Sequence, residues 1–360
     1  MLTLLLSVSC SSLKIAESST TQAIPLPPPP PIDPNSIFTA LQPDSIPAID
    51  EPKFDTTVNA TDMEADERVI GLSINGDHRA YPINILSTHE IVNDVVGGQP
   101  VAVTWCPLCY SALVFSREVD DLVLTFGVSG KLLENTLVMF DRETNSLWSQ
   151  LYGGGIKGTQ TGTSLSVFPS TLTTWEAWQT QYPDSQVLSK RQTCSRFDCG
   201  TYSSNPRGSY EVDPYSSYYG STDAGIVNRQ IPREAGGAQA KKRVLGVRIA
   251  GIAQAYPFEV LADKRIVNDT VGNMDVVVWF EPSSQTGTAF QREVNGRSLT
   301  FSLDPKNSAY FVDETGQRWV GLDGTAVNGN QRLIPVIYTP AFDFGWYGYF
   351  PESGTYTPIP

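Results

Sequence analysis

The sequence predicts a mainly β fold, a β-rich α+β protein built from two tandem, internally duplicated β-meander units with short helices. Composition is the first sign, because 29 Gly, 26 Pro and only four Met favour turns and strands over long helices. The second is an internal repeat, in which residues 67–105 align without a gap with residues 242–280 at a spacing of 175. The third is length, because 360 residues exceed one typical domain of roughly 100 to 200.

The repeat divides the chain into five segments. They are a signal-like or lipoprotein-like segment at 1–24, a Pro-rich linker and lead-in at 25–66, the first repeat unit at 67–188, a polar, Tyr-rich linker with a Cys pair at 189–242, and the second, degenerate repeat unit at 243–360. Each unit has a normal domain size. The sequence therefore predicts two similar domains that pack against each other through their duplicated faces.

The N-terminal segment resembles an export signal. Its apolar run MLTLLLSVS stops before Cys10 and is too short for a membrane-spanning helix, which needs about 20 residues. Ser9 and Cys10 resemble a lipoprotein cleavage box, so Cys10 is the candidate for lipidation and a lipid anchor. The proline tract at 25–34 then acts as a stiff spacer. We expect an exported protein that is periplasmic, secreted or at the cell surface.

The first unit is predicted to be a meander that begins with a hairpin. Asn75-Gly76 separates expected strands at 69–74 and 80–85, and Asn93-Asp94 is expected to form a turn. Further strands are expected at 101–105, 113–115 and 122–126.

One short helix is expected over 173–181, where a Thr cap, a first-turn Glu and spaced Trp residues occur together. The linker at 190–241 is expected to lie across the surface. Its Cys194 and Cys199 have polar neighbours without His, which favours a loop-closing structural disulfide.

The duplication helps to separate structural residues from functional ones. Residues kept in both units are expected to serve the fold, and they include Asn93, Asp94, Arg117, Glu118, Asp141 and Trp148. Other positions change chemistry between the units: His89 becomes Lys264, Glu90 becomes Arg265, and Cys106-Pro-Leu-Cys109 becomes Glu281-Pro-Ser-Ser284. Function is therefore expected in the first unit.

The segment Cys106-Pro-Leu-Cys109 follows one expected strand and precedes another, which is typical of a metal knuckle in which two thiolates converge on one ion. His89 is the best third ligand, because the chain has only two His and His78 lies in a hairpin turn. Glu90, Met139 or water could take a fourth position. Thiolate with imidazole suits copper or zinc.

Two neighbouring polar residues are weaker candidates. Ser149 and Gln150 precede a Gly-rich segment that has no good counterpart in the second unit, so they could line a pocket near the thiols.

Other functions stay open for the cysteine pair. Cys106 and Cys109 could form a thiol-disulfide redox pair or a plain disulfide. A non-catalytic surface or adhesion protein also suits the proline spacer and the Tyr-rich linker, and the sequence does not decide whether the protein is an enzyme. The net charge of −13 argues against nucleic acid as a partner, and the substrate or protein partner stays unknown.

Several motifs together resemble the domain-of-unknown-function family 3179. They are Ala80-Tyr-Pro, His89-Glu-Ile-Val-Asn-Asp94, Trp105-Cys-Pro-Leu-Cys109, Leu124-Thr-Phe-Gly-Val-Ser-Gly130, the stretch from Met139 to Gln150 and Phe344-Gly-Trp-Tyr-Gly-Tyr-Phe-Pro351. The resemblance implies an exported or envelope-associated protein and supplies no reaction. Tyr110 stands where that family usually places Gly, and the segment with Cys194 and Cys199 is a local insertion.

Overall fold

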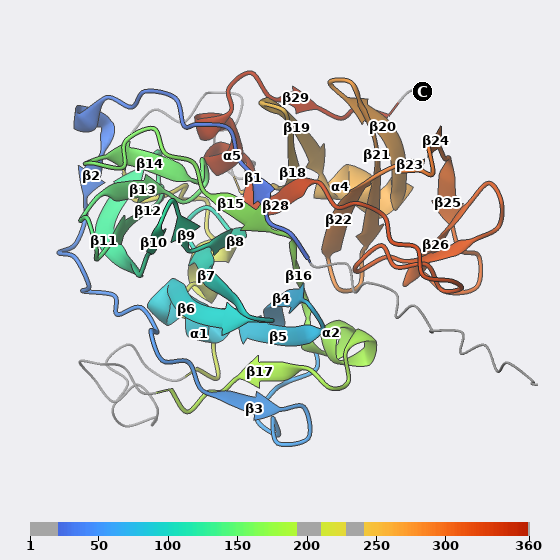
Figure 1. The fold of residues 1–360 in the computed structure, drawn as a ribbon, viewed down its shortest axis with the longest axis horizontal. Coiled ribbons are helices and arrows are strands. Elements are labelled where there is room, and N and C mark those ends of the chain that lie inside the picture. The colour runs from blue at the N-terminus through green and yellow to red at the C-terminus, as the bar shows by residue number, and fades with distance from the viewer. Residues whose placement is uncertain (1–20, 193–209, 228–240, 359–360) are drawn as a thin grey trace, which may run out of the picture.

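The structure is a computed structural model that describes residues 21–192, 210–227 and 241–358. Figure 1 shows two lobes side by side, with the strands of the first unit in blue to green and those of the second unit in orange to red. The prediction of a mainly β fold is confirmed, since short strands dominate and every described helix is brief.

Three sheets and a small hairpin build most of the first unit, and each sheet gains one strand from the segment before residue 67. The first sheet has the spatial order β16 (Ser170–Thr174), β4 (Arg68–Ile74), β5 (Asp77–Pro82), β17 (Gln186–Leu188) and β3 (Phe54–Thr56). The second sheet has the order β1 (Ile24–Pro25), β15 (Ser166–Phe168), β8 (Ser111–Ser116), β7 (Gln99–Cys106) and β6 (Ile91–Val96). The third sheet has the order β14 (Gly154–Lys157), β13 (Leu147–Ser149), β12 (Thr136–Asp141), β11 (Phe126–Leu133) and β2 (Phe38–Thr39), and the hairpin consists of β9 (Glu118–Val119) and β10 (Leu122–Val123).

The second unit has smaller versions of these sheets. The first of these sheets has the spatial order β28 (Ile337–Phe342), β18 (Arg243–Ile249), β19 (Ile252–Pro257) and β29 (Gly354–Thr355). The second has the order β20 (Ile266–Val271), β21 (Met274–Glu281) and β22 (Thr286–Gln291), and the third has the order β25 (Phe301–Leu303), β26 (Tyr310–Asp313) and β27 (Arg318–Val320). The hairpin consists of β23 (Glu293–Val294) and β24 (Arg297–Ser298).

Helices of one or two turns join the strands. They are η1 (Pro34–Ser36), α1 (Ile83–His89), α2 (Trp175–Gln181), α3 (Ser216–Gly220), α4 (Phe258–Lys264) and α5 (Asp343–Tyr349). Eight successive elements of the first unit, from β4 to β10 with α1, recur in order and length as β18 to β24 with α4. The duplication itself stays a prediction, which a superposition of the two units would test.

Helix α1 was not expected from the sequence. The strand predicted at 80–85 ends at Pro82, and Ile83 begins α1 instead. Pro82 has the extended backbone of a helix N-cap, and Ile83 and Leu86 are buried at a helical spacing of three residues. Because β-branched residues are typical of strands, this segment was expected to continue the strand and the short helix was not expected. The helix predicted over 173–181 is confirmed as α2, which Thr174 caps through its side chain.

The kept residue Asn93 ties two sheets together. Its side chain donates to the carbonyl oxygen of Phe126 at 2.8 Å and accepts from the Phe126 N–H at 3.0 Å. Asn268 makes the same pair of bonds to Phe301, both at 2.8 Å. Asn93 and Asp94 therefore serve the fold, but the turn predicted for them is wrong, because both lie inside strand β6.

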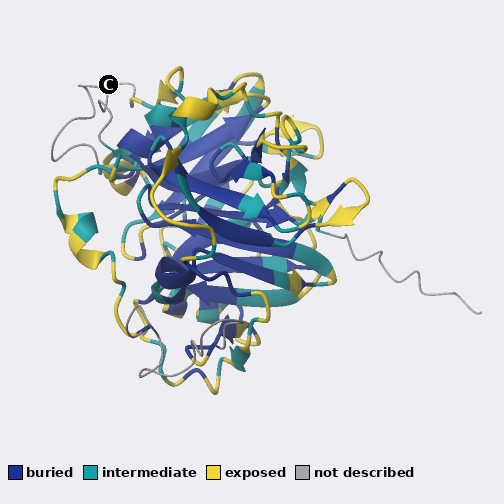
Figure 2. Cartoon of the chain, turned by 90° about the vertical axis from the view of Figure 1, so that its left-hand side faces the viewer, coloured by how far each residue is buried: buried dark blue, intermediate teal, exposed yellow. Residues whose placement is uncertain are grey.

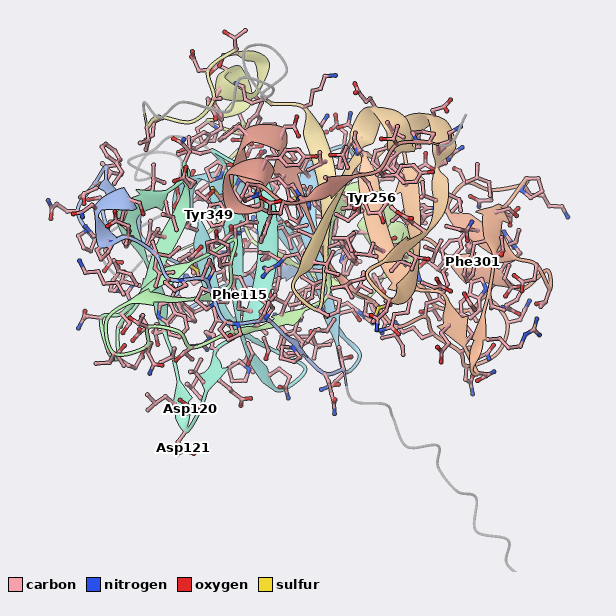
Figure 3. The ribbon with its side chains drawn as sticks, turned by 90° about the horizontal axis from the view of Figure 1, so that it is seen from above. Phe115, Asp120, Asp121, Tyr256, Phe301 and Tyr349 are labelled. Carbon is pink, nitrogen blue, oxygen red and sulfur yellow. The ribbon has the colours of Figure 1, made fainter. Side chains whose placement is uncertain are left out.

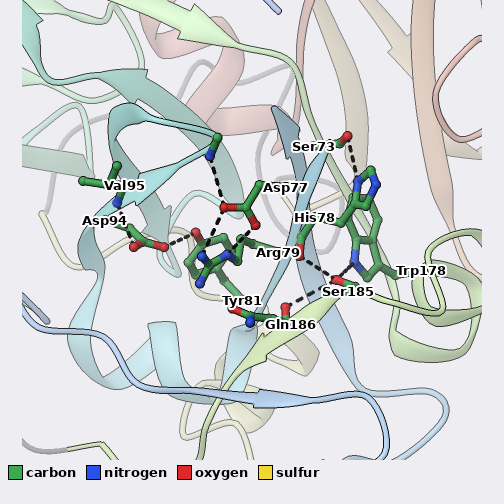
Figure 4. Close-up of polar contacts among 11 residues, drawn as sticks. Ser73, Asp77, His78, Arg79, Tyr81, Asp94, Val95, Trp178, Ser185 and Gln186 are labelled. Carbon is green, nitrogen blue, oxygen red and sulfur yellow. Dashed lines mark hydrogen bonds and ion pairs between the residues drawn. The ribbon is translucent and has the colours of Figure 1, made fainter. Parts of the chain in front are cut away.

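A second kept feature is a Trp–Ser contact after each closing helix. Trp178 Nε1 donates to Ser185 Oγ at 2.8 Å, and Trp346 Nε1 donates to Ser353 Oγ at the same distance. Figure 4 shows the first of these contacts beside His78 and Ser73. The indoles are buried, so each bond satisfies a donor that water cannot reach.

Two pairs of strands form the junction between the two units. Strand β28 of the second unit packs on β8 of the first, where Thr339 Oγ1 donates to the Ala112 carbonyl at 2.8 Å. Strand β16 of the first unit packs on β22 of the second, where Thr286 Oγ1 donates to Thr173 Oγ1 at 2.8 Å. Figure 2 shows that the central strands are buried while exposed residues occupy mainly the outer loops.

The linker between the units is not wholly a surface segment. Its segment 210–227 places Tyr210 in the core of the first unit and packs Tyr218 and Tyr219 against that core. In the part of the chain that the structure describes, no helix is long and apolar enough to span a membrane.

Candidate functional site

The cysteine pair lies in a tight hairpin loop. Cys106 is the last residue of β7 and pairs with Ser111, the first residue of β8, so Cys109 lies in the turn between these strands. Tyr110 ends this turn in the left-handed region with φ of 58°, and its counterpart Gln285 has φ of 47°. The turn therefore demands a left-handed residue in both units, which explains the Gly that the resembling family usually has there.

Tyr110 offsets its strained backbone by packing its ring. Left-handed backbone at a non-Gly residue costs on the order of 1 kcal/mol. The ring centroid of Tyr110 lies 5.0 Å from that of Trp105, 5.1 Å from that of Phe342 and 5.3 Å from that of Tyr219. The side chain thus joins the loop to the linker and to the second unit.

Both thiols are free and buried, with Cys106 at 1% and Cys109 at 0% exposure. Burial raises the pKa of Cys106 well above its usual range. Burial also acts to raise the pKa of Cys109, but hydrogen bonds from Cys106, Ser111 and Thr136 outweigh it and lower that pKa. The pair therefore holds its first negative charge on Cys109, with the Cys106 thiol as a donor.

Hydrogen-bond donors surround the sulfurs. The Leu137 N–H donates to Cys106 Sγ at 3.4 Å, and the N–H of Cys109 also faces that sulfur. Ser111 places its Oγ 3.1 Å from Cys109 Sγ, and its N–H faces the same sulfur. Backbone N–H groups directed at both sulfurs stabilise thiolates in this loop.

The candidate residues Ser149 and Gln150 are connected to the surroundings of the thiols through Tyr349 and Ser111, respectively. Ser111 Oγ donates to Gln150 Oε1 at 2.8 Å, and Gln150 Nε2 donates to Thr104 Oγ1 at 3.2 Å. Ser149 Oγ donates to Tyr349 OH at 3.3 Å. A continuous polar chain therefore runs from Cys109 through Ser111 to Gln150 in an otherwise apolar core.

Helix α5 of the second unit covers the site. Figure 1 shows α5, in red, beside the green strands of the first unit, and Figure 3 shows Tyr349 above those strands. The Phe342 N–H donates to the Cys109 carbonyl at 2.8 Å, and Tyr349 OH donates to the Leu133 carbonyl at 3.0 Å. A Cβ atom on Gly345 would lie 2.8 Å from Cys109 Cβ, so only Gly allows this close approach.

Sequence reasoning missed Tyr349 and Gly345, because the second unit was expected to be a degenerate scaffold. The alignment of the two units nevertheless contained a signal for both residues, because each differs from its counterpart. In the alignment of Trp178 with Trp346, Tyr349 and Gly345 stand opposite Gln181 and Ala177 of the first unit. The same comparison that singled out the thiols could therefore have found both residues.

The predicted third ligand, His89, is not brought to the thiols. Its Nδ1 lies 2.6 Å from the Pro47 carbonyl and its Nε2 lies 2.5 Å from Tyr210 OH. The intervening sheet explains the separation, because Trp105 and Cys106 point to opposite faces of β7. Trp105 Nε1 donates to Ser87 Oγ of α1 at 3.1 Å, so the helix that carries His89 covers the face without the thiols.

The remaining candidates are also placed apart from a shared metal position. Glu90 is the left-handed C-cap of α1, with φ of 60°. Met139 is buried in the same core cluster as the thiols, but it alternates along β12 with Thr136, which contacts Cys109, and so points to the other face of that strand. In the described residues no group of three His, Cys, Asp or Glu could hold a metal ion. Cys10, Cys194 and Cys199 lie outside the described residues.

We expect His89 to stabilise the fold. Replacing His89 with Leu leaves the Pro47 carbonyl and the Tyr210 hydroxyl without their partner in the core, which should lower the free energy of unfolding by about 2–4 kcal/mol in a urea titration. His78 is the matched control, because it is only partly buried, and His78→Leu should cost less. Equal losses for the two variants would contradict a structural role specific to His89.

The fold and the site together define a mainly β protein of two joined units, with a buried pair of free cysteines where the units meet. The chain belongs to the family described as "Protein of unknown function (DUF3179)", whose model matches residues 43–353. The resemblance found in the sequence is thereby confirmed. No curated protein and no solved structure matches the chain.

Proposed function

We propose that this chain is an exported protein that binds one soft metal ion, Cu(I), through the thiolates of Cys106 and Cys109. The observation that carries the proposal is a pair of unbridged cysteines in one hairpin loop with backbone N–H groups directed at both sulfurs. Thiolates are the ligands that soft metals select. Export is supported by the apolar run before Cys10 and the proline spacer.

Copper suits the site better than zinc. A structural zinc ion takes four ligands, and among the described residues no third His, Cys, Asp or Glu joins the two thiols. Cu(I) accepts two thiolates alone. The complex would carry one negative charge, and the Leu137 N–H at Cys106 Sγ and the Ser111 N–H facing Cys109 Sγ would stabilise that charge in the core.

Thiol-disulfide exchange is the second candidate, and the unequal pKa values of the two thiols favour it. The surroundings argue against it. The residues after Cys106 form a turn and strand β8, so the cysteine pair does not begin a helix, as the pair of a thioredoxin-like active site does. Both sulfurs are also buried beneath α5, where a protein disulfide could not reach them without a movement of that helix.

Anaerobic titration with Cu(I) against a colorimetric chelator tests the proposal on reduced protein without an affinity tag. We expect about one ion per chain, and X-ray absorption should show sulfur ligands without imidazole. Zn(II) should bind far more weakly, because two of its positions would lack protein ligands. Failure of Cu(I) to bind the reduced protein would overturn the proposal. A disulfide that cycles reversibly at a mild potential would then favour the redox function.

A further inference from the structure

A cavity lies where the N-terminal segment crosses the second unit, and neither cysteine of the pair is among its lining residues. It has a volume of about 310 Å³. Its wall is mostly apolar and includes Ile24, Leu26, Ile249, Met274, Val336 and Ile337. This volume is within the range of small-molecule sites, and at the roughly 30 Å³ of one water it would hold about ten non-hydrogen atoms.

Among the described residues, the cavity wall contains one cation and no carboxylate. Arg248 is only 9% exposed, and its Nη1 donates to the carbonyls of Leu151 at 2.9 Å and Tyr152 at 3.2 Å. Its guanidinium carbon lies 4.9 Å from the ring centroid of Phe350. Burial lowers the pKa of Arg248 to about 10, so the side chain stays charged at neutral pH.

Two donors of this guanidinium remain available. Among the described residues Arg248 Nε and Nη2 have no hydrogen-bond partner, yet neither nitrogen is sealed from solvent. In the part of the chain that the structure describes, no Asp or Glu lines the cavity, and the one other polar side chain of its wall is the amide of Gln291. A buried cation without an anion is unfavourable, so the site is complementary to a negative group.

Arg248 of the second unit has no cationic counterpart at the equivalent position of the first unit. At the spacing of 175, Arg248 stands opposite Ser73, whose Oγ lies 2.9 Å from His78 Nδ1. The pocket that includes Ser73 has a volume of only about 30 Å³. Like the two thiols, Arg248 and its cavity therefore have no counterpart at the equivalent position of the other unit.

We propose that this cavity binds a small apolar carboxylate, such as a fatty acid of about eight carbons, with the carboxylate on Arg248 and the tail against the apolar wall. The planar fork of Nε and Nη2 matches two carboxylate oxygens. Gln291 supplies a further amide at the wall, and the aliphatic residues exclude water from the tail. The site is separate from the cysteine pair and does not depend on a metal.

Isothermal titration of the metal-free full chain with octanoate, beside 1-octanol, tests the proposal. Octanoate should bind with one site per chain and at least about tenfold more tightly than octanol, because only octanoate carries the charge that Arg248 recognises. Arg248→Met should abolish that preference. No octanoate binding, or equal binding of the two probes, would overturn the proposal.

A second variant tests the site even if Arg248→Met does not fold. Val336→Trp fills the cavity without removing the cation, so it should weaken octanoate at least about tenfold while Arg248 remains. Arg248→Lys keeps the charge but loses the fork, and should bind octanoate more weakly than the natural chain. Unchanged octanoate binding in folded Val336→Trp would place the ligand elsewhere and refute the site.

Discussion

Replacing Gly71 with Ala is expected to remove at least about 3 kcal/mol from the free energy of unfolding. A Cβ atom at Gly71 would overlap the six-membered ring of Trp178. That indole is buried and donates to Ser185 Oγ at 2.8 Å, so moving it would break the bond and open a cavity in the core. Urea denaturation followed by Trp fluorescence measures the loss.

The second unit repeats this arrangement and provides an internal test. A Cβ atom at Gly246 would overlap Trp346 in the same way, so Gly246→Ala should be destabilising to a similar degree. Gly220→Ala is the matched control, because no atom lies within 4 Å of a Cβ at the end of α3. If Gly71→Ala were as stable as Gly220→Ala, the close packing of strand and indole would not contribute as described.

The repeat made much of the fold predictable from the sequence. Its spacing of 175 residues is also the spacing of β7 and β21, and the hairpin at Asn75-Gly76 was correctly expected. The errors arose where tertiary contacts override local signals. Asn93 and Asp94 have turn-like composition, but they lie in a strand because Asn93 pairs with the backbone of Phe126 in another sheet.

The candidate site was predictable in part. The loss of both thiols in the second unit singled out Cys106 and Cys109, and the absence of a counterpart singled out Gln150. His89 was expected beside the thiols, but it lies across β7 from them. Nearness in sequence does not show on which face of β7 a side chain from another element lies. Tyr349 comes from the far end of the chain, and only the docking of α5 on the first unit brings it to the site.

This docking explains how a repeat can support one asymmetric site. The first unit supplies the thiols, and the second unit supplies the helix that covers them. Gly345 permits the approach that Ala177, at the equivalent position of α2, would hinder. The two units are therefore complementary at the site, although eight successive elements recur in both of them in the same order.

Replacing Cys106 or Cys109 with Ser is expected to weaken Cu(I) binding by well over a hundredfold. Substitution of groups that merely orient metal ligands costs about 10- to 100-fold, and each of these variants removes one of two ligands. Ser111→Ala, which removes the hydroxyl 3.1 Å from Cys109 Sγ, should fall in that smaller range. Competition with a chelator of known affinity, in reduced protein, gives the values.

Two controls separate the thiol site from the alternatives. Ser284 occupies the place of Cys109 in the second unit, with its Oγ 2.8 Å from Thr286 Oγ1, so Ser284→Ala should leave the Cu(I) affinity unchanged. His89→Gln should also leave it unchanged, because β7 separates the imidazole from the thiols and the ring already contacts Pro47 and Tyr210. If His89→Gln weakened Cu(I) as strongly as Cys106→Ser, the metal would require a rearranged site that includes the imidazole, and the two-thiolate proposal would be wrong.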